Sequence, residues 1–408
     1  MSSYLQISHP SKKITADCIL PGSKSESNRL LIINELSGKK IQVENLSSAD
    51  DTQELKRLLA SPFKTLDVKD AGTSMRFLIA YFCVINRNKV ISGSQRMQER
   101  PIGKLVDALR YIGFKIHYLQ REGFPPVEVI PTERTHLKYE LNVEADESSQ
   151  FISALLMIAP VFPDGLTIRL QKRIVSKSYI KMTLGILKKC GINSTWKKNE
   201  IRIDHQKYRQ VTYKAEPDWS AASYWYSIAA LSTEAHIELK GFRKNSFQGD
   251  QVISEWMKNF GVSTQFTDDG ILIRKESEPV LNEMTFDFNN SPDLAQTIIV
   301  LAAAKNINLK MKGLKTLRIK ETDRIAALQK ELRKIGAHLV QHKADFYEVK
   351  PNYKNTSERI ETYNDHRMAM AFAPLALNSE ISIIQPSVVT KSYPDFWKHL
   401  KNAGFEIK

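Results

Sequence analysis

Six apolar segments, each opened by a small group of polar residues, recur along this chain and limit how it can fold. Ser, Thr and Asp are preferred at helix N-caps, so each segment is predicted to be a helix. Helices that are apolar on most faces have to be buried on most faces. The segments begin near residues 24, 72, 148, 219, 291 and 365 and read KSESNRLLIINEL, GTSMRFLIAYF, SSQFISALLMIAPVF, WSAASYWYSIAAL, SPDLAQTIIVLAAA and DHRMAMAFAPLAL.

A second repeat alternates with the first: a helical pattern stops at a glycine, and a short β-prone run follows. Glycine directly after a helix allows the left-handed turn that ends it, and the alternating residues beyond it predict a strand. A degenerate first copy, TQELKRLLASPFKTLDV, has Ser61 where the glycine would stand. The other five copies, 68 to 78 residues apart, end at Gly113, Gly191, Gly261, Gly336 and Gly404.

The two repeats together predict an α/β protein of six units. A chain of 408 residues exceeds the size of a single core, so two domains of three units each are expected. An ordinary doubly wound α/β fold is the alternative, but it would make the regular spacing of the glycines a coincidence.

The composition is that of a soluble globular protein, with 42% hydrophobic and 25% charged residues. The longest apolar stretch, 151–162, is too short to span a bilayer, and residues 1–13 contain no apolar signal core. We therefore expect a cytoplasmic protein. The three cysteines, Cys18, Cys83 and Cys190, lack metal-ligand spacing and are expected to be reduced thiols.

The net charge of +14 is compatible with nucleic acid, an anionic membrane or small anionic substrates as partners. The basic residues are dispersed, with no run of five Lys or Arg and no basic–aromatic cluster typical of a nucleic-acid module. A lysine-rich solvated surface explains the charge equally well. Each buried helix nevertheless presents free N–H groups and partial positive charge at its start, so converging starts would form an anion site.

Seven segments at these helix starts stand in a recognisable order from about residue 20 to the C-terminus: PGSKSESNR, DAGTSMR, RMQERPIG, SSQF, KETDR, YNDHRMAM and TKSYPDF. They resemble the signature segments of the 5-enolpyruvylshikimate-3-phosphate (EPSP) synthase family. The resemblance implies the enolpyruvyl transferase fold, a two-domain inverse α/β barrel built from six βαβαββ-type repeats. One domain would comprise 1–20 and 218–408, the other 21–217, with the active site in the interdomain cleft.

The same resemblance implies an enzyme of the shikimate pathway, a 3-phosphoshikimate 1-carboxyvinyltransferase. It would transfer the enolpyruvyl group of phosphoenolpyruvate to the 5-hydroxyl of shikimate 3-phosphate by addition–elimination, releasing phosphate on the route to chorismate and aromatic amino acids. No metal or organic cofactor is implied. The partners would be these two small molecules rather than nucleic acid or a membrane, and the family expectation is a monomer.

Roles for individual residues also follow from the resemblance. Asp293 would take the proton from the 5-hydroxyl, Glu321 would move protons at the methylene carbon, and Lys24 would stabilise the departing phosphate. Binding of shikimate 3-phosphate would involve Lys24, Ser25, Arg29, Ser148, Ser149, Gln150, Ser176, Asp293, Thr316 and Lys320. Binding of phosphoenolpyruvate would involve Lys24, Gly72, Arg96, Gln150, Arg324, Arg367 and Lys391.

The charges of this set suit two anionic substrates. Its seven cations less the two carboxylates Asp293 and Glu321 leave +5, against roughly −6 for two phosphate monoesters and two carboxylates. Cations that face one another in an empty site repel, so the free enzyme is expected to be open and to close when the anions bind.

Four residues depart from the family pattern. Asp70 stands where Asn is typical, Phe77 and Thr316 replace Pro and Asn, and Pro217 replaces Gly. These departures bear on substrate affinity, domain closure and sensitivity to the phosphonate glyphosate, for which Gly72 leaves space, rather than on the type of reaction.

Two other functions fit parts of the pattern. UDP-N-acetylglucosamine enolpyruvyl transferases are related but rely on a cysteine in a mobile loop, whereas Cys83 lies in an apolar helix and Cys190 directly precedes a helix-stop glycine. A non-catalytic nucleic-acid-binding relative would explain the positive charge, but Asp293 and Glu321 inside the basic site would repel a phosphate backbone.

Overall fold

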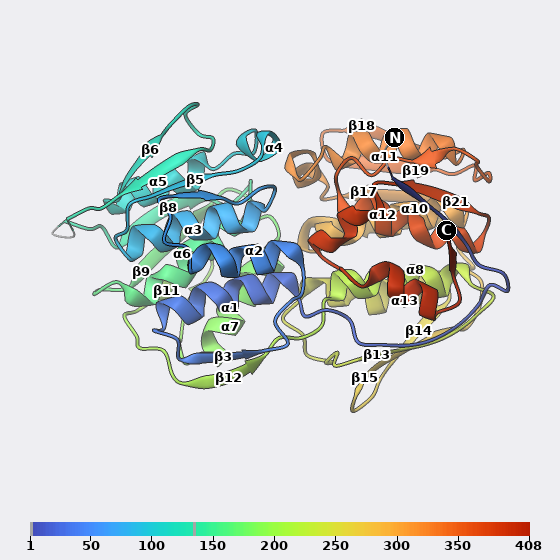
Figure 1. The fold of residues 1–408 in the computed structure, drawn as a ribbon, viewed down its shortest axis with the longest axis horizontal. Helices are drawn as coiled ribbons and strands as arrows, with labels where there is room; N and C mark the ends of the chain where they lie inside the picture. The colour runs from blue at the N-terminus through green and yellow to red at the C-terminus, as the bar shows by residue number, and fades with distance from the viewer. Residues whose placement is uncertain (1–2, 134–135) are drawn as a thin grey trace. The chain divides into compact units, whose positions relative to one another are not determined.

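The computed structural model describes residues 3–133 and 136–408 (Figure 1). The described residues form two compact units. Of the described residues, unit 1 comprises 3–23, 48–50 and 216–408, and unit 2 comprises 24–47, 51–133 and 136–215. No helix among these residues is both long and apolar enough to cross a membrane.

Unit 2 alternates helices with short strands, drawn from blue to green in Figure 1. Its helices are α1 (Lys24–Leu36), α2 (Asp50–Leu59), α3 (Gly72–Val84), α4 (Gln95–Gln98), α5 (Gly103–Ile112), α6 (Ser149–Ile158) with the 3-10 turn η1 (Ala159–Val161), and α7 (Lys177–Lys189). Its strands are β3 (Ile41–Glu44), β4 (Thr65–Asp67), β5 (Lys89–Ser92), β6 (Lys115–Tyr118), β7 (Val127–Ile130), β8 (Glu140–Glu144), β9 (Leu166–Gln171), β10 (Thr195–Lys197), β11 (Glu200–Ile203) and β12 (Val211–Lys214).

Unit 1 follows the same plan with more 3-10 helices. Its helices are α8 (Trp219–Leu231), η2 (Gly249–Val252), α9 (Ile253–Trp256), η3 (Met257–Phe260), η4 (Phe288–Asn290), η5 (Pro292–Leu294), α10 (Ala295–Ala304), η6 (Lys315–Ile319), α11 (Arg324–Lys334), α12 (His366–Phe372), η7 (Ala373–Leu377), η8 (Pro386–Lys391) and α13 (Phe396–Asn402). Its strands are β1 (Tyr4–Ser8), β2 (Lys13–Cys18), β13 (Glu234–Lys240), β14 (Val262–Phe266), β15 (Gly270–Lys275), β16 (Glu283–Asp287), β17 (Asn308–Lys312), β18 (His338–Lys343), β19 (Phe346–Lys350), β20 (Arg359–Ile360), β21 (Ile381–Ile384) and β22 (Glu406–Ile407).

Five sheets among the described residues share one topology, in which two parallel strands are followed by two antiparallel ones. This arrangement is that of the βαβαββ unit implied by the family resemblance. The strand orders are β4-β5-β7-β6 and β8-β9-β11-β10 in unit 2, and β2-β13-β15-β14, β16-β17-β19-β18 and β20-β21-β1-β22 in unit 1.

Strands next to the points where the chain changes unit pair far from their sequence neighbours. β2 lies near the N-terminus yet pairs in parallel with β13, and β12 pairs in parallel with β3. The first repeat, made of β12, α1, β3 and α2, differs from the others because its sheet has two strands. Only five residues separate α2 from β4, which already belongs to the next sheet, so no room is left for an antiparallel pair.

The apolar segments form the helical cores of the units, as predicted. In unit 2, α1, α3 and α6 pack against one another, and in unit 1 α8, α10 and α12 do the same. Figure 1 shows these helices side by side within each unit. All residues of α10 are buried, so the polar residues at the start of such a helix are the only ones of the segment that can meet a ligand.

The five glycines expected to stop helices all have a left-handed backbone. Their φ angles are +127° at Gly113, +90° at Gly191, +72° at Gly261, +79° at Gly336 and +95° at Gly404. An added Cβ at Gly336 would also lie 2.2 Å from the Asn352 carbonyl oxygen, well inside contact distance. This glycine therefore serves both the turn and a close approach of two backbone segments.

Replacement of Gly336 by Ala should lower the free energy of unfolding by about 3 kcal/mol or more, because backbone strain and a steric clash add. Gly38→Ala is the matched control: φ there is +70°, and among the described residues no atom lies within 4 Å of an added Cβ. Its expected cost is about 1–2 kcal/mol. Urea unfolding of both variants would test this, and equal losses would contradict the role of the close approach.

Candidate active site

The starts of three helical segments in unit 1 converge on one buried arginine. Arg324 opens α11, and its side chain is only 2% exposed. Its guanidinium contacts three carboxylates: Nε lies 2.7 Å from Asp365 Oδ2, Nη1 3.1 Å from Asp293 Oδ1, and Nη2 2.9 Å from Glu321 Oε2. Because guanidinium donors point in fixed directions, this one group sets the positions of all three carboxylates.

The charge of Arg324 is maintained by these partners. Burial alone would lower the pKa of Arg324, but the carboxylates, Asp365 first and then Glu321 and Asp293, outweigh burial and raise that pKa above its ordinary value. Asp365 is fully buried and also caps α12 by accepting a hydrogen bond from Arg367 N at 2.9 Å. Asp293 and Glu321 are 14% and 15% exposed, so they are the carboxylates that a substrate can reach.

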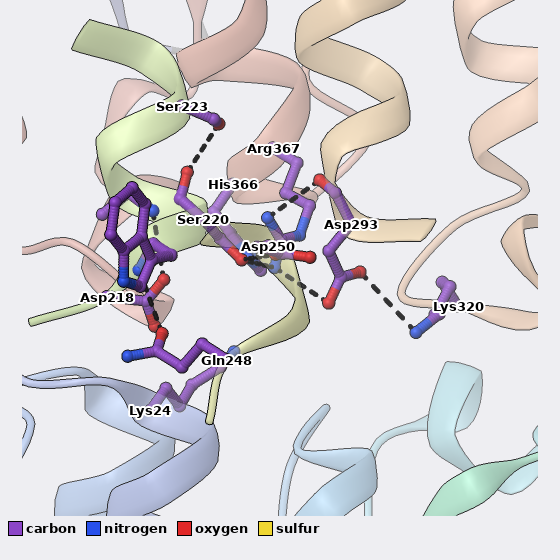
Figure 2. A network of polar contacts seen from close by, with 12 residues as sticks. Lys24, Asp218, Ser220, Ser223, Gln248, Asp250, Asp293, Lys320, His366 and Arg367 are labelled. Carbon is purple, nitrogen blue, oxygen red and sulfur yellow. Dashed lines mark hydrogen bonds and ion pairs between the residues drawn. The ribbon is translucent and has the colours of Figure 1, made fainter. Parts of the chain in front are cut away.

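Asp293 is approached by two further cations. Arg367 Nη2 lies 3.1 Å from Asp293 Oδ2, and Nη1 donates a hydrogen bond to the Asp293 carbonyl at 3.2 Å. Lys320 Nζ lies 3.7 Å from Asp293 Oδ1. Figure 2 shows Arg367 and Lys320 on different sides of the Asp293 carboxylate. Three cations, Arg324, Arg367 and Lys320, therefore surround the Asp293 carboxylate.

Lys391, the last residue of η8, contacts an unusual turn that precedes α12. Tyr363 and Asn364 both adopt left-handed φ angles, +53° and +56°, which are sterically costly for residues other than glycine. Lys391 Nζ donates a hydrogen bond to the Asn364 carbonyl at 2.9 Å. Paired strained residues of this kind concentrate at functional sites, where the surrounding structure keeps them in place.

In unit 2, the start of α3 is covered by two buried arginines that the sequence did not single out. Arg76 Nη1 donates a hydrogen bond to the Gly72 carbonyl at 2.9 Å. A Cβ on Gly72 would lie 2.5 Å from Arg100 Nη2 and 2.6 Å from Arg76 Nη1. The expected Arg96 instead forms a partly exposed ion pair with Glu99 at 2.9 Å. The structure thus brings Arg100, from the same RMQERPIG segment, against Gly72.

The expected serines stand at the starts of α6 and α7. Ser148 Oγ caps α6 by accepting a hydrogen bond from Gln150 N at 3.3 Å, and Ser149 is the first, buried residue of that helix. Gln150 Nε2 donates to Thr73 Oγ1 at 3.0 Å, which joins the starts of α6 and α3. Ser176 precedes α7 with a left-handed φ of +52°, and its hydroxyl makes no capping hydrogen bond to that helix.

The two expected cations of α1 have different surroundings. Lys24 Nζ forms an ion pair with Asp51 Oδ2 at 2.8 Å. Arg29 is buried, and its guanidinium donates to Thr183 Oγ1 at 2.7 Å and to Ser153 Oγ at 3.0 Å. Burial lowers the pKa of Arg29 to about 10. Arg29 therefore links α1, α6 and α7, whereas Lys24 lies at the start of its helix.

Two more expected residues have informative surroundings. Arg29 Nη1 donates to the Ser25 carbonyl at 2.8 Å, so this contact uses the backbone of Ser25 rather than its hydroxyl. Thr316 lies in η6, and its Oγ1 is enclosed without a hydrogen-bond partner within residues 3–133 and 136–408. Over the same residues, no group of three or more His, Cys, Asp or Glu side chains is arranged to bind a metal ion.

Sequence reasoning missed Arg100, and it assigned no role to Asp365. The sequence of the RMQERPIG segment cannot tell which arginine reaches Gly72, since Arg96 and Arg100 are both arginines of one short segment, four residues apart. Asp365 is correctly read as an N-cap residue, but the pattern does not show that its carboxylate also neutralises Arg324.

Comparisons with known proteins agree on one family. Residues 54–400 match the family described as EPSP synthase (3-phosphoshikimate 1-carboxyvinyltransferase). A relative named 3-phosphoshikimate 1-carboxyvinyltransferase from Bacteroides fragilis is 45% identical over 407 residues, covering 98% of each chain. Another of that name from Escherichia coli is 34% identical, covering 96% of this chain and 97% of the relative.

Solved structures show the same fold at low sequence identity. An EPSP synthase from Acinetobacter baumannii matches with a TM-score of 0.76 at 20% identity, covering 100% of both chains. The enolpyruvyl transferase NikO from Streptomyces tendae matches with a TM-score of 0.74 at 12% identity, covering 100% of this chain and 99% of the other.

Replacement of Arg324 by Met should lower the free energy of unfolding by about 3–5 kcal/mol, because it leaves buried carboxylates without their charge partner. Arg318→Met is the matched control, since the Arg318 side chain is 40% exposed and pairs with Asp323 at 3.0 Å. Its expected cost is within about 1 kcal/mol. Thermal and urea unfolding would compare the two, and similar small losses would refute the structural importance of Arg324.

Proposed function

This chain belongs to the EPSP synthase family, and on that premise we propose that it transfers the enolpyruvyl group of phosphoenolpyruvate to the 5-hydroxyl of shikimate 3-phosphate. The reaction releases phosphate and is a step toward chorismate and the aromatic amino acids. The observation that supports it best is a pair of partly exposed carboxylates, Asp293 and Glu321, that both bind the same buried arginine, Arg324. Addition followed by elimination needs proton transfer at an oxygen and at a carbon, and two carboxylates can divide this work.

In the proposed mechanism, Asp293 takes the proton of the 5-hydroxyl while that oxygen forms a bond to C2 of phosphoenolpyruvate. Protonated Glu321 gives its proton to the methylene carbon, which becomes a methyl group. Glu321 then removes a proton from this methyl group as the C2–phosphate bond breaks. Phosphate leaves with the bonding electron pair and takes up the proton that Asp293 removed, so both carboxyl groups return to their starting states. Nη1 and Nη2 of Arg324 contact the two carboxylates, and this keeps their separation constant during the reaction.

Cations at the helix starts bind the anionic groups in this proposal. Arg367, Arg324 and Lys391 in unit 1 contact phosphoenolpyruvate, and Lys320 contacts the shikimate ring beside Asp293. Fixed positive groups of this kind stabilise negative charge as it develops, without reorganisation during the reaction.

The helix starts of unit 2 are proposed to act on the same two substrates. Lys24 stabilises the departing phosphate, and the hydroxyls of Ser148, Ser149 and Ser176 donate to the 3-phosphate. Ser176 suits this role because its hydroxyl is not used to cap α7. At the start of α3 we assign the phosphoenolpyruvate contact to Arg100 ahead of Arg96, because Arg100 lies against Gly72.

The cysteines speak against the related cell-wall enolpyruvyl transferases, which rely on a cysteine in a mobile loop. Cys18, Cys83 and Cys190 are all buried. Burial raises the pKa of Cys18 to about 11 and that of Cys190 to about 12, and it raises the pKa of Cys83 further still. None of the three thiols can therefore serve as an exposed, ionisable catalytic group. Buried free thiols also suit the reducing cytoplasm, where we propose that the enzyme works as a monomer.

Asp293→Asn and Glu321→Gln should each lower kcat by about 10²–10⁴-fold, because each removes one proton-transfer group while keeping its shape. Binding of shikimate 3-phosphate, measured by calorimetry, should change little. The assay is phosphate release from phosphoenolpyruvate with and without shikimate 3-phosphate. Release that does not depend on shikimate 3-phosphate would refute the proposed reaction, and full activity of either variant would refute its proton-transfer role.

Gly72→Ala should raise the KM for phosphoenolpyruvate by about 10–100-fold, because the new methyl group must displace the guanidinium groups of Arg100 and Arg76. Gly103→Ala is the matched control at the first residue of α5, where the nearest atom to an added Cβ is 3.4 Å away. Steady-state kinetics should show no change for this control. An unchanged KM in Gly72→Ala would remove Arg100 from the phosphoenolpyruvate site.

A further inference from the structure

A buried carboxylate that the proposed mechanism does not use lies next to this site. Asp250 belongs to η2 and is only 5% exposed. It accepts a hydrogen bond from the hydroxyl of Ser220, the second residue of α8. Figure 2 shows Asp250 and Ser220 close to Arg367, on the side away from Lys320.

Contacts continue from Asp250 to the reacting groups. Ser220 Oγ lies 3.4 Å from Arg367 Nη2, and the same Nη2 lies 3.1 Å from Asp293 Oδ2. A serine hydroxyl has a single proton, so a hydroxyl that donates to Asp250 can present only lone pairs to Arg367. Asp250 therefore sets the direction of the Ser220 O–H bond, and the Ser220 oxygen accepts a hydrogen bond from the Arg367 guanidinium.

The side chain of Asp250 binds another side chain, whereas the polar residues near it bind backbone groups. Asp218 caps α8 by accepting a hydrogen bond from Ala221 N at 3.0 Å. Gln248 accepts from Trp219 N at 3.0 Å and donates to the Pro217 carbonyl at 2.8 Å. Both residues bind backbone groups and so shape the local fold, whereas Asp250 acts on a side chain that contacts Arg367.

A carboxylate is a costly residue for this position. Burial raises the pKa of Asp250 to about 7, with Asp293 and Asp218 adding to the effect and Ser220 and Arg367 opposing it. A neutral residue of the same shape would be easier to bury. Costly buried ionisable groups concentrate at functional sites, which favours a role in the reaction over a role in folding alone.

We propose that Asp250 is a positioning residue for the transferase: through the Ser220 hydroxyl it fixes the guanidinium of Arg367 in the orientation that contacts Asp293 and the phosphoenolpyruvate anion. This inference rests on the proposed function and deepens it, because it names the groups that orient a substrate-binding arginine. We expect its main effect on phosphoenolpyruvate, because Ser220 contacts Arg367, which is assigned to that substrate.

The test uses the full chain with Ser220→Ala, Asp250→Ala, the double variant, and Asp250→Asn. Ser220→Ala and Asp250→Ala should each raise the KM for phosphoenolpyruvate by about tenfold, with a smaller loss of kcat through the Arg367–Asp293 contact, while the KM for shikimate 3-phosphate stays within about threefold. The double variant should be no worse than the poorer single variant, because both act through one chain of contacts. Asp250→Asn should recover most of the affinity, since its amide oxygen can accept the same hydrogen bond.

Glu348→Gln is the control for loss of an enclosed carboxylate in the same unit, because Glu348 accepts a hydrogen bond from His342 on a strand pair. It should leave both KM values unchanged. The inference is overturned if Ser220→Ala and Asp250→Ala leave the KM for phosphoenolpyruvate unchanged, if they raise both KM values equally, or if their effects add in full. Failure of the unaltered enzyme to release phosphate would instead overturn the proposed function, and this inference with it.

Discussion

Enclosing a guanidinium in protein costs free energy that its partners have to offset, and Arg324 is offset by carboxylates from separate helix starts. Asp293 and Asp365 come from distant repeats, so neutralising Arg324 draws those repeats together. The interaction that stabilises unit 1 is therefore the same one that places its proposed proton-transfer groups. Of the three carboxylates, Asp365 is fully buried, whereas Asp293 and Glu321 are partly exposed and can take part in the proposed proton transfers.

Unit 2 also contains a buried arginine, but it is used differently. Arg29 is surrounded by the hydroxyls of Thr183 and Ser153 and lies over the rings of Phe77 and Tyr179. Burial lowers the pKa of Arg29 because Tyr179 and Glu26 oppose burial only in part, whereas three carboxylates outweigh burial at Arg324 and raise its pKa. Arg29 joins helices of the core, and the serines at the helix starts remain available to an anion.

Much of this arrangement could be predicted from the sequence, because the signals are local. Apolar runs with polar starts and left-handed glycines such as Gly336 determine the helices and their ends. What could not be predicted depends on contacts between repeats. Arg100 and Arg96 look equivalent in sequence, and only the packing of the segment against α3 separates them. The shortened first repeat was indicated by Ser61, but its two-stranded sheet follows from the pairing of β12 with β3.

Two of the departures from the family pattern, Asp70 and Phe77, can be explained by the contacts that their atoms make. Asp70 accepts a hydrogen bond from Ser94 with its side chain, while its carbonyl oxygen accepts from Arg100 Nη1 at 3.0 Å. The contact to the arginine thus uses the backbone, which an exchange of Asn for Asp does not alter. Phe77 is fully buried, with its ring 5.4 Å from the Arg29 guanidinium carbon, so it adds a cation–π contact that proline could not make. Both substitutions act beside the helix starts rather than on the groups proposed to react, and they are therefore expected to tune affinity while leaving the chemistry to Asp293 and Glu321.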